Sequence, residues 1–231
     1  MSWTKSPGAQ DNYPNAATNK HSYTSSGPVL PCSKGSGVSV NPASPMFPYR
    51  EAYGLIMPKT TGSGSPTSRV YRGGYVYQWS FINGDGVDVD FNFDRDLASE
   101  SPLALHVHWS HNGTDISGTL SLAFNYSYAR AYNQDNFGAE KQVEISYNTT
   151  NIATTPQYRQ RVDSCALSTP GGSGSLIDES VVEPCFVIMG KLRVTTLPTI
   201  TGGYLFIHGA NILYKSTCIG TVAITPPFYT P

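Results

Sequence analysis

A chain of 231 residues with a formal net charge of −1 is long enough to form one large domain with a substantial hydrophobic core. Charged residues make up only 13% of it, and it lacks the long Ala-, Leu-, Glu- and Lys-rich tracts that favour helices. No basic stretch is dense enough for a phosphate-binding surface, no apolar run approaches membrane-spanning length, and the start lacks a signal-peptide layout. We therefore expect an all-β protein that binds neither nucleic acid nor membrane.

Residues 1–68 form the first predicted unit, an extended N-terminal arm. They contain nine of the 17 prolines and several Gly, Ser and Thr clusters, without sustained periodicity. Such a segment buries too little apolar surface to offset its ordering entropy unless it lies on another surface. Phe47, Tyr49 and Tyr53 are the candidate contacts to a partner or a neighbouring subunit. The arm is also basic and the remainder acidic, so the arm of one subunit could bind the acidic part of a neighbouring subunit.

From residue 69 to residue 231 apolar and polar residues alternate, which is typical of strands with one buried face. The segment VDVDFNF places its Val and Phe side chains on one face and Asp88 and Asp90 on the other. The pattern recurs in TLSLAFNYSY, KQVEISYN, CFVIMGKLRVTT and GGYLFIHGANILYKST, with turn-forming sequences between them. About eight antiparallel strands without helical interludes predict a jelly-roll-like two-sheet β-sandwich over residues 69–231.

Tyr75, Tyr77 and Trp79 also alternate, in the segment GGYVYQW. Exposed aromatic rings there could stack on sugars, which would make the chain a glycan- or receptor-binding module. Alternation of this kind is more often core packing. Our interpretation is that these rings lie in the core, and glycan binding stays an alternative.

The segment LALHVHWSHNGTD contains three histidines within six positions. Alternation puts its large apolar residues on the core face, namely Leu103, Leu105, Val107 and Trp109. The outer face then carries His106 and His108, which strand geometry places about 7 Å apart. His111 falls in the turn that follows.

A His-x-His pair on a strand also occurs in metal-binding cupins, which are jelly rolls. Where cupins have a Gly before this pair and a Glu after it, this chain has Glu100 and then Asn112 or Gly113. The inward face is apolar as well, so a cupin-like metalloprotein is a remote alternative. We assign no metal ligands, no cofactor and no catalytic residues, because no nucleophile turn or carboxylate pair suggests them.

The four cysteines, Cys32, Cys165, Cys185 and Cys218, form no CxxC pair. A structural zinc is therefore not expected. Reduced, buried thiols are the preferred interpretation, and a disulfide between Cys165 and Cys185 is the alternative.

The two outer histidines have candidate partners in the preceding strand. If that strand and the histidine strand form a hairpin, Asp90 lies opposite His106 and Asp88 lies opposite His108. Each such pair contributes up to about 1 kcal/mol. A strict jelly roll often sends consecutive strands to opposite sheets, which would separate the pairs and free the histidines for a subunit contact. All four residues are therefore interface candidates.

LALHVHWS, with VDVDFNF before it, LSLAFNYSYA after it and the late strand YLFIHGANILYKST, resembles a family of tailed-bacteriophage virion proteins. The resemblance implies a non-enzymatic structural protein that forms a homotrimer and decorates or cements the capsid. Its partners would be the major capsid protein or other virion proteins, held by the arm, and its location would be the virion, assembled in the host cytoplasm. A neck, tail or fibre component is the alternative within the particle, because a fold does not reveal its location.

Overall fold

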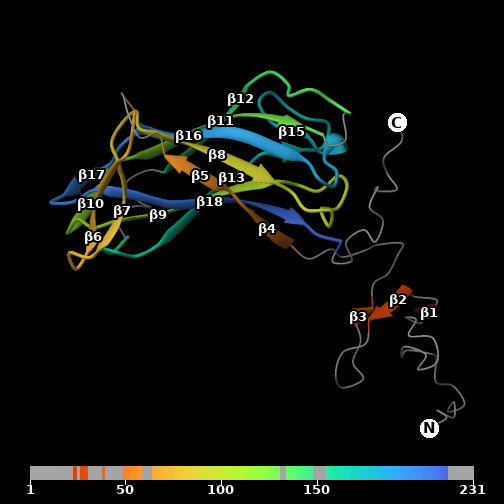
Figure 1. Cartoon of the computed structure of the whole chain (residues 1–231), viewed down its shortest axis with the longest axis horizontal. Coiled ribbons are helices and arrows are strands. Elements are labelled where there is room, and N and C mark those ends of the chain that lie inside the picture. Colours follow the sequence, from red (N-terminus) through yellow and green to blue (C-terminus); the bar gives the residue numbers. More distant parts are fainter. Residues whose placement is uncertain are drawn as a thin grey trace, which may run out of the picture. The chain divides into compact units, whose positions relative to one another are not determined.

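The computed structural model describes residues 49–58, 64–130, 134–147 and 155–217, together with three short N-terminal strands (Figure 1). The chain divides into two units, Met1–Phe47 and Pro48–Pro231. In the first unit the described strands are β1 (Tyr23–Thr24), β2 (Gly27–Leu30) and β3 (Val38–Ser39), which form an antiparallel sheet. The rest of this unit, including Phe47, lies outside the described residues.

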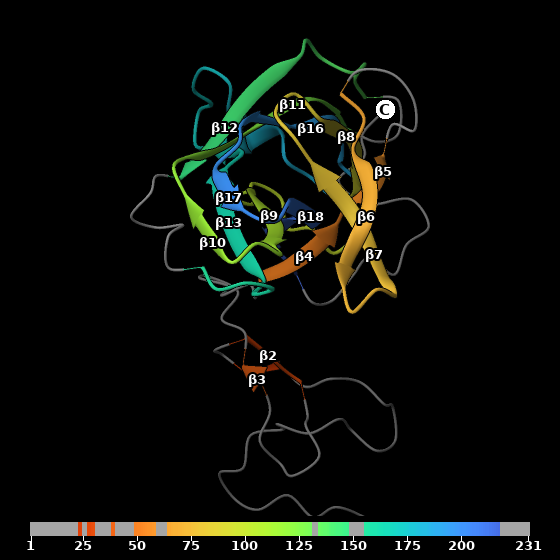
Figure 2. The same ribbon diagram turned by 90° about the vertical axis from the view of Figure 1, so that its left-hand side faces the viewer.

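The second unit is a sandwich of two antiparallel sheets, which confirms the predicted fold class. One sheet has the order β12-β11-β16-β8-β5, with the strands β5 (Leu55–Pro58), β8 (Gly86–Asn92), β11 (Leu120–Ala129), β12 (Lys141–Tyr147) and β16 (Val187–Thr196). The other contains β4 (Tyr49–Tyr53), β6 (Thr67–Arg72), β7 (Val76–Phe81), β9 (Ala104–His111), β13 (Arg161–Ala166) and β18 (Leu205–Lys215). Its order is β13-β9-β18-β7-β6, with β4 also paired to β18. Figure 2 shows the two sheets as separate layers.

Smaller elements connect these strands. They are β10 (Asp115–Ser117) paired with β17 (Thr199–Thr201), β14 (Ser168–Thr169) paired with β15 (Ile177–Asp178), and the 3-10 turn η1 (Glu179–Val181). In the described part of the chain, no helix has the length and apolar character needed to span a membrane.

The core lies between the two sheets and contains the residues that alternation places there. The inward side chains of β8, β9 and β11 are buried, among them Val89, Trp109 and Phe124, except that Tyr128 near the end of β11 is partly buried. Phe93, which follows β8, packs edge-to-face against Tyr214 of β18 with ring centroids 5.4 Å apart, and so joins the two sheets. Period-two alternation therefore predicts the buried faces of these strands correctly.

The sandwich begins before residue 69, so the predicted arm is too long. β4 pairs with β18 and β5 pairs with β8, which makes residues 49–58 strands of the two sheets. Both strands are short, and Pro48 and Pro58 bracket them, so their composition resembles that of the arm. Proline is tolerated at strand ends and on edges, where no ladder hydrogen bond is lost.

Candidate functional site

The hairpin formed by β6 and β7 is the first candidate surface. It turns through Gly73 and Gly74, whose φ angles of +65° and +78° suit the two central residues of a tight hairpin turn. On β7, only Ser80 and Phe81 pair with β18. None of the described strands pairs with the rest of the hairpin, up to its turn.

Tyr75 and Tyr77 are exposed on this hairpin, with 94% and 58% of their surface accessible. The interpretation of these two rings as core residues is therefore wrong. Trp79 does pack partly against the core, as alternation predicts. Tyr77 lies on β7 beyond the stretch that pairs with β18, and Tyr75 lies in the turn before β7 begins.

Tyr71 attaches the hairpin to the outer face of the six-stranded sheet. Its ring packs edge-to-face against Phe206, His208 and Tyr158, with centroids 5.0–5.4 Å apart. Its hydroxyl lies 2.9 Å from Oγ of Ser110. These contacts fix the position from which Tyr75 and Tyr77 project.

Two arginines of β6 stack on aromatic rings of the sandwich. The guanidinium of Arg69 lies 4.2 Å from the ring centroid of Tyr204, and that of Arg72 lies 4.9 Å from the ring centroid of Tyr158. The hairpin thus presents two exposed tyrosines beside two oriented, positively charged groups.

His106 and His108 lie on the outer face of β9, as predicted, and both are half-buried. His108 Nε2 is 2.5 Å from Oδ1 of Asn211, and its Nδ1 is 2.8 Å from Nε2 of Gln160. His106 stands opposite Asn211 on one neighbouring strand and Ser164 on the other. The polar neighbours of these histidines thus come from β18 and from the region of β13.

Asp88 and Asp90 are far from these histidines in the topology, because β8 and β9 belong to different sheets. Asp88 stands opposite Lys191 and Asp90 opposite Met189, both on β16. The predicted hairpin of β8 and β9, with its Asp–His pairs, is therefore wrong. The two strands are instead separated into different sheets, as expected of a jelly roll. All four residues are on outer faces, where their role as interface contacts stays a prediction.

His111 lies within β9 and is buried, so its placement in a turn is wrong. Its Nε2 donates a hydrogen bond to the carbonyl of Thr155 at 2.8 Å, and its own carbonyl accepts one from the amide of Tyr158. The strand is longer than expected because β18 pairs with it as far as Leu205.

Ser110 and His208 form a pair that the sequence did not suggest, since they are 98 residues apart. The hydroxyl of Ser110 is 2.7 Å from Nε2 of His208. A serine beside a histidine base is the arrangement of a nucleophile, but Ser110 is fully buried beneath this outer-face cluster. No substrate reaches its Oγ in this arrangement, so the pair stabilises the hairpin attachment.

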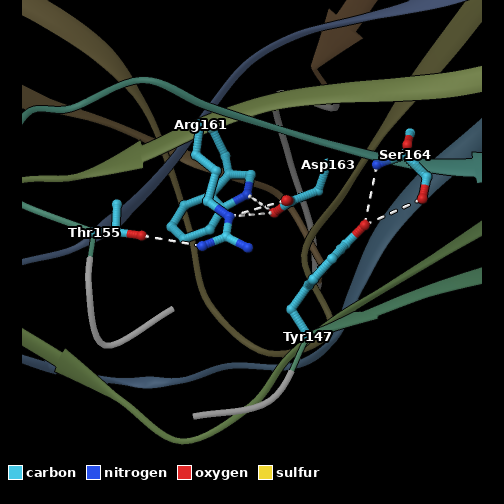
Figure 3. Close-up of polar contacts among 6 residues, drawn as sticks. Tyr147, Thr155, Arg161, Asp163 and Ser164 are labelled. Atoms are coloured by element: carbon cyan, nitrogen blue, oxygen red, sulfur yellow. Dashed lines mark hydrogen bonds and ion pairs between the residues drawn. The ribbon is translucent and has the colours of Figure 1, made fainter. Parts of the chain in front are cut away.

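Another polar cluster lies between β12 and β13, at one side of the sandwich (Figure 3). Asp163 accepts a hydrogen bond from Nε1 of Trp109 at 2.6 Å and a bifurcated one from Nε of Arg161, with its two oxygens at 2.9 and 3.0 Å. The guanidinium also lies 5.3 Å from the ring of Tyr147, whose hydroxyl bonds the backbone of Ser164. Asp163 is buried and its oxygens are engaged, so this cluster is structural.

The outer face of the five-stranded sheet forms an open depression of about 590 Å³, the sheet groove. Its lining residues are Gly64, Gly84, Asp88, Asp90, Asn125, Tyr126, Ser127, Glu140, Met189, Gly190, Lys191 and Arg193. Carboxylates, amides and cations thus share one shallow surface, which suits a polar partner more than an apolar ligand.

Within the described residues, no group of three or more His, Cys, Asp or Glu side chains lies close enough to hold a metal ion. Cys165 and Cys185 are not joined to each other, so the alternative disulfide between them is not formed. Burial raises the pKa of Cys165 to about 11, which keeps this thiol protonated at neutral pH. Cys32 and Cys218 lie outside the described residues.

The remaining interface candidates are Tyr49 and Tyr53, and both are exposed on β4. β4 pairs with β18 on one side only, so these rings lie at an edge of the sheet. An exposed edge strand is a natural place for a further contact.

No protein-family model matches the chain, and no curated protein matches its sequence. Among solved structures it is similar to CBM35 from Cellvibrio japonicus Abf62, with 15% identity, a TM-score of 0.30, and coverage of 71% of this chain and 97% of that one. It is similar to TmCBM61 in complex with β-1,4-galactotriose at 11% identity and a TM-score of 0.24, covering 71% and 87% of the two chains. It is also similar to Xyl-CBM35 in complex with a glucuronic acid-containing disaccharide at 15% identity and a TM-score of 0.25, covering 72% and 94%. At these identities and TM-scores, no ligand or binding residue of those proteins is transferred to this chain.

Proposed function

We propose that this chain is a non-enzymatic binding protein that recognises a glycan through the β6–β7 hairpin. The observation that carries the proposal is the exposure of Tyr75 and Tyr77 on the part of the hairpin with which no other described strand pairs. A large exposed apolar surface on a soluble domain commonly marks an interaction site.

Sugar rings have an apolar face and a polar rim, and the hairpin matches both. A tyrosine ring packs against the C–H face of a sugar while its hydroxyl bonds to the rim. Tyr75 lies in the turn and Tyr77 lies on β7, so both exposed rings belong to the turn end of the hairpin. Two exposed rings so close in the chain can contact neighbouring sugars of an oligosaccharide.

The anchoring contacts make the hairpin a preorganised surface. Tyr71, close to the turn, holds the hairpin against the sheet, and Arg69 and Arg72 are oriented by their stacking on Tyr204 and Tyr158. A surface that is ordered before binding loses less conformational entropy when a ligand arrives. The arginines can also donate hydrogen bonds to sugar hydroxyls or to a carboxylate.

The experiment is a glycan array probed with the labelled full-length chain. We expect retention on a restricted set of glycans, at an affinity typical of an exposed site. A folded chain that is retained on no glycan of a broad array contradicts the proposal.

A structural role in a tailed-phage virion is the second candidate. The strand signature around His106 and His108 supports it, together with the exposed Tyr49 and Tyr53 at the edge directly after the arm. In this reading a homotrimer decorates the capsid, and neck, tail or fibre positions are the alternatives. Immunogold labelling of particles from the virus that encodes the chain is the test. Label on the head supports decoration, label on the tail supports a tail component, and unlabelled particles contradict a virion role.

A further inference from the structure

The outer face of the five-stranded sheet carries two short charge ladders of opposite sign. β8 and β16 lie side by side in the five-stranded sheet (Figure 1). Asp88 and Asp90 of β8, and Lys191 and Arg193 of β16, are on its outer face. All four line the sheet groove. The face is therefore negative along one strand and positive along the next.

Among the residues that the structure describes, these charges have no ion-pair partner. Lys191 stands directly opposite Asp88 in the register, yet the described residues provide no ion pair or hydrogen bond to any of the four side chains. The stem of Lys191 instead crosses β8 over Gly86, where an added Cβ would lie 3.0 Å from its Cε. Both ladders are thus available to a partner.

The arrangement is complementary to itself. Consider a second copy placed face to face with the first, related by a two-fold axis that runs parallel to the strands and midway between β8 and β16. That rotation places β16 of each copy over β8 of the other and keeps the position along the strand. Lys191 then faces Asp88 of the second copy, and the same contact occurs twice, as a two-fold interface requires.

The rest of the face fits the same operation. The axis also places β5 of one copy over β11 of the other, because each lies one strand outside the central pair. β5 presents the exposed side chains Leu55 and Met57, and β11 presents Asn125 and Ser127 in the groove. The exposed apolar side chains of one copy thus pack into the sheet groove of the other, and their burial adds a hydrophobic contribution to the free energy of dimerisation.

We propose that the outer face of the five-stranded sheet binds a second copy of this chain in a two-fold dimer. Reciprocal contacts between Lys191 and Asp88 set its register. Arg193 and Asp90 extend the two ladders on either side of this contact. The dimer is independent of the glycan-binding hairpin, which belongs to the other sheet.

Charge reversal tests this arrangement by sedimentation velocity of the full-length chain. Asp88→Lys makes both central positions of a copy positive, and Lys191→Asp makes both negative. Each single variant therefore repels itself, and we expect its dimer dissociation constant to rise at least about tenfold. An equimolar mixture of the two variants pairs a positive face with a negative face, so it forms a heterodimer. The double variant D88K/K191D restores self-complementarity.

The control variants are Asp115→Lys and Arg159→Asp, which change exposed charges away from the groove and leave the dimer intact. Circular dichroism and thermal melting confirm that every variant is folded. The wild-type dimer weakens as salt rises, because exposed charge pairs are screened. A wild-type chain that is monomeric at low salt overturns the proposal. So does an oligomer that the single variants do not affect, or a mixture of folded variants that fails to associate.

Discussion

The hydroxyl of Ser110 lies 2.7 Å from Nε2 of His208, and it is also bonded to the hydroxyl of Tyr71. This chain of contacts joins β9 and β18 to the hairpin that carries the exposed tyrosines. Burial, helped by the neighbouring His108, lowers the pKa of His208 below its usual value. Nε2 of a neutral His208 can accept a hydrogen bond from the hydroxyl of Ser110, whereas Nε2 of a charged His208 cannot.

The first prediction concerns pH. Because the folded pKa of His208 is lowered, its contribution to stability is complete above the unfolded pKa of about 6.5. It is lost as the pH falls from there through the folded pKa. His208→Gln keeps an acceptor without a titrating charge, so its free energy of unfolding should depend less on pH between about 7.5 and 5. Urea unfolding at several pH values measures this, with His106→Gln as the control, and parallel profiles for wild type and His208→Gln would contradict it.

The second prediction concerns Asp163. Its removal leaves the guanidinium of Arg161 and the indole N–H of Trp109 without their shared acceptor in a buried site. We expect Asp163→Ala to lower the free energy of unfolding by about 3 kcal/mol or more. Asp115→Ala, at an exposed position, should change it by less than about 0.5 kcal/mol. Guanidinium chloride unfolding compares the two, and equal small effects would refute the structural role of this cluster.

The third prediction concerns Gly190 on β16. A Cβ there would lie 2.6 Å from the carbonyl oxygen of Asn125 and 2.6 Å from the ring of Phe124. Gly190→Ala should therefore destabilise the fold by about 1–3 kcal/mol. Gly209→Ala is the matched control, since nothing lies within 4 Å of its added Cβ. Thermal melting of both variants is the measurement, and a Gly190→Ala melt that coincides with that of the control is the contrary outcome.

The fourth prediction concerns Asp96, which ties β4 to the sandwich. Burial alone raises the pKa of this carboxyl, but hydrogen bonds from Ser216, Arg50 and Tyr214 outweigh burial and leave the pKa lowered. Its contribution to stability is therefore present above the unfolded pKa of about 3.9 and is lost as the pH falls through the folded pKa. Asp96→Asn weakens the contact to Arg50, so the amides of β4 should exchange with deuterium faster while those of β16 do not. Unchanged exchange in β4 would show that Asp96 does not hold this strand.

The sequence predicts strand faces well wherever both sheets cover the strand. Alternation identifies Val89, Trp109 and Phe124 as core residues. In a strand with one buried face, every second side chain points into the core, so a two-residue period is enough to predict which residues are buried. Alternation wrongly predicts that Tyr75 and Tyr77 are buried, because the local pattern does not show how far the neighbouring strand β18 extends along the hairpin.

The local sequence pattern also does not predict which strands pair with one another. The partner of Asp88 is on β16, about 100 positions along the chain, and β4 pairs with residues that follow it by some 160 positions. These contacts depend on the order of strands in each sheet, and many orders are compatible with the same alternation. The sequence therefore names candidate residues such as Tyr77 and Asp88, but their neighbours in each surface follow only from the folded chain.

The most direct test of the central claim is the affinity of hairpin variants for a glycan that the wild-type chain retains on an array. Isothermal titration should show at least about a tenfold loss of affinity for Tyr75→Ala/Tyr77→Ala, because the stacking surface is removed. Tyr49→Ala/Tyr53→Ala, which removes two exposed tyrosines at the β4 edge, should bind like wild type. If the hairpin double variant retains wild-type affinity while folded, the β6–β7 hairpin is not the glycan-binding site.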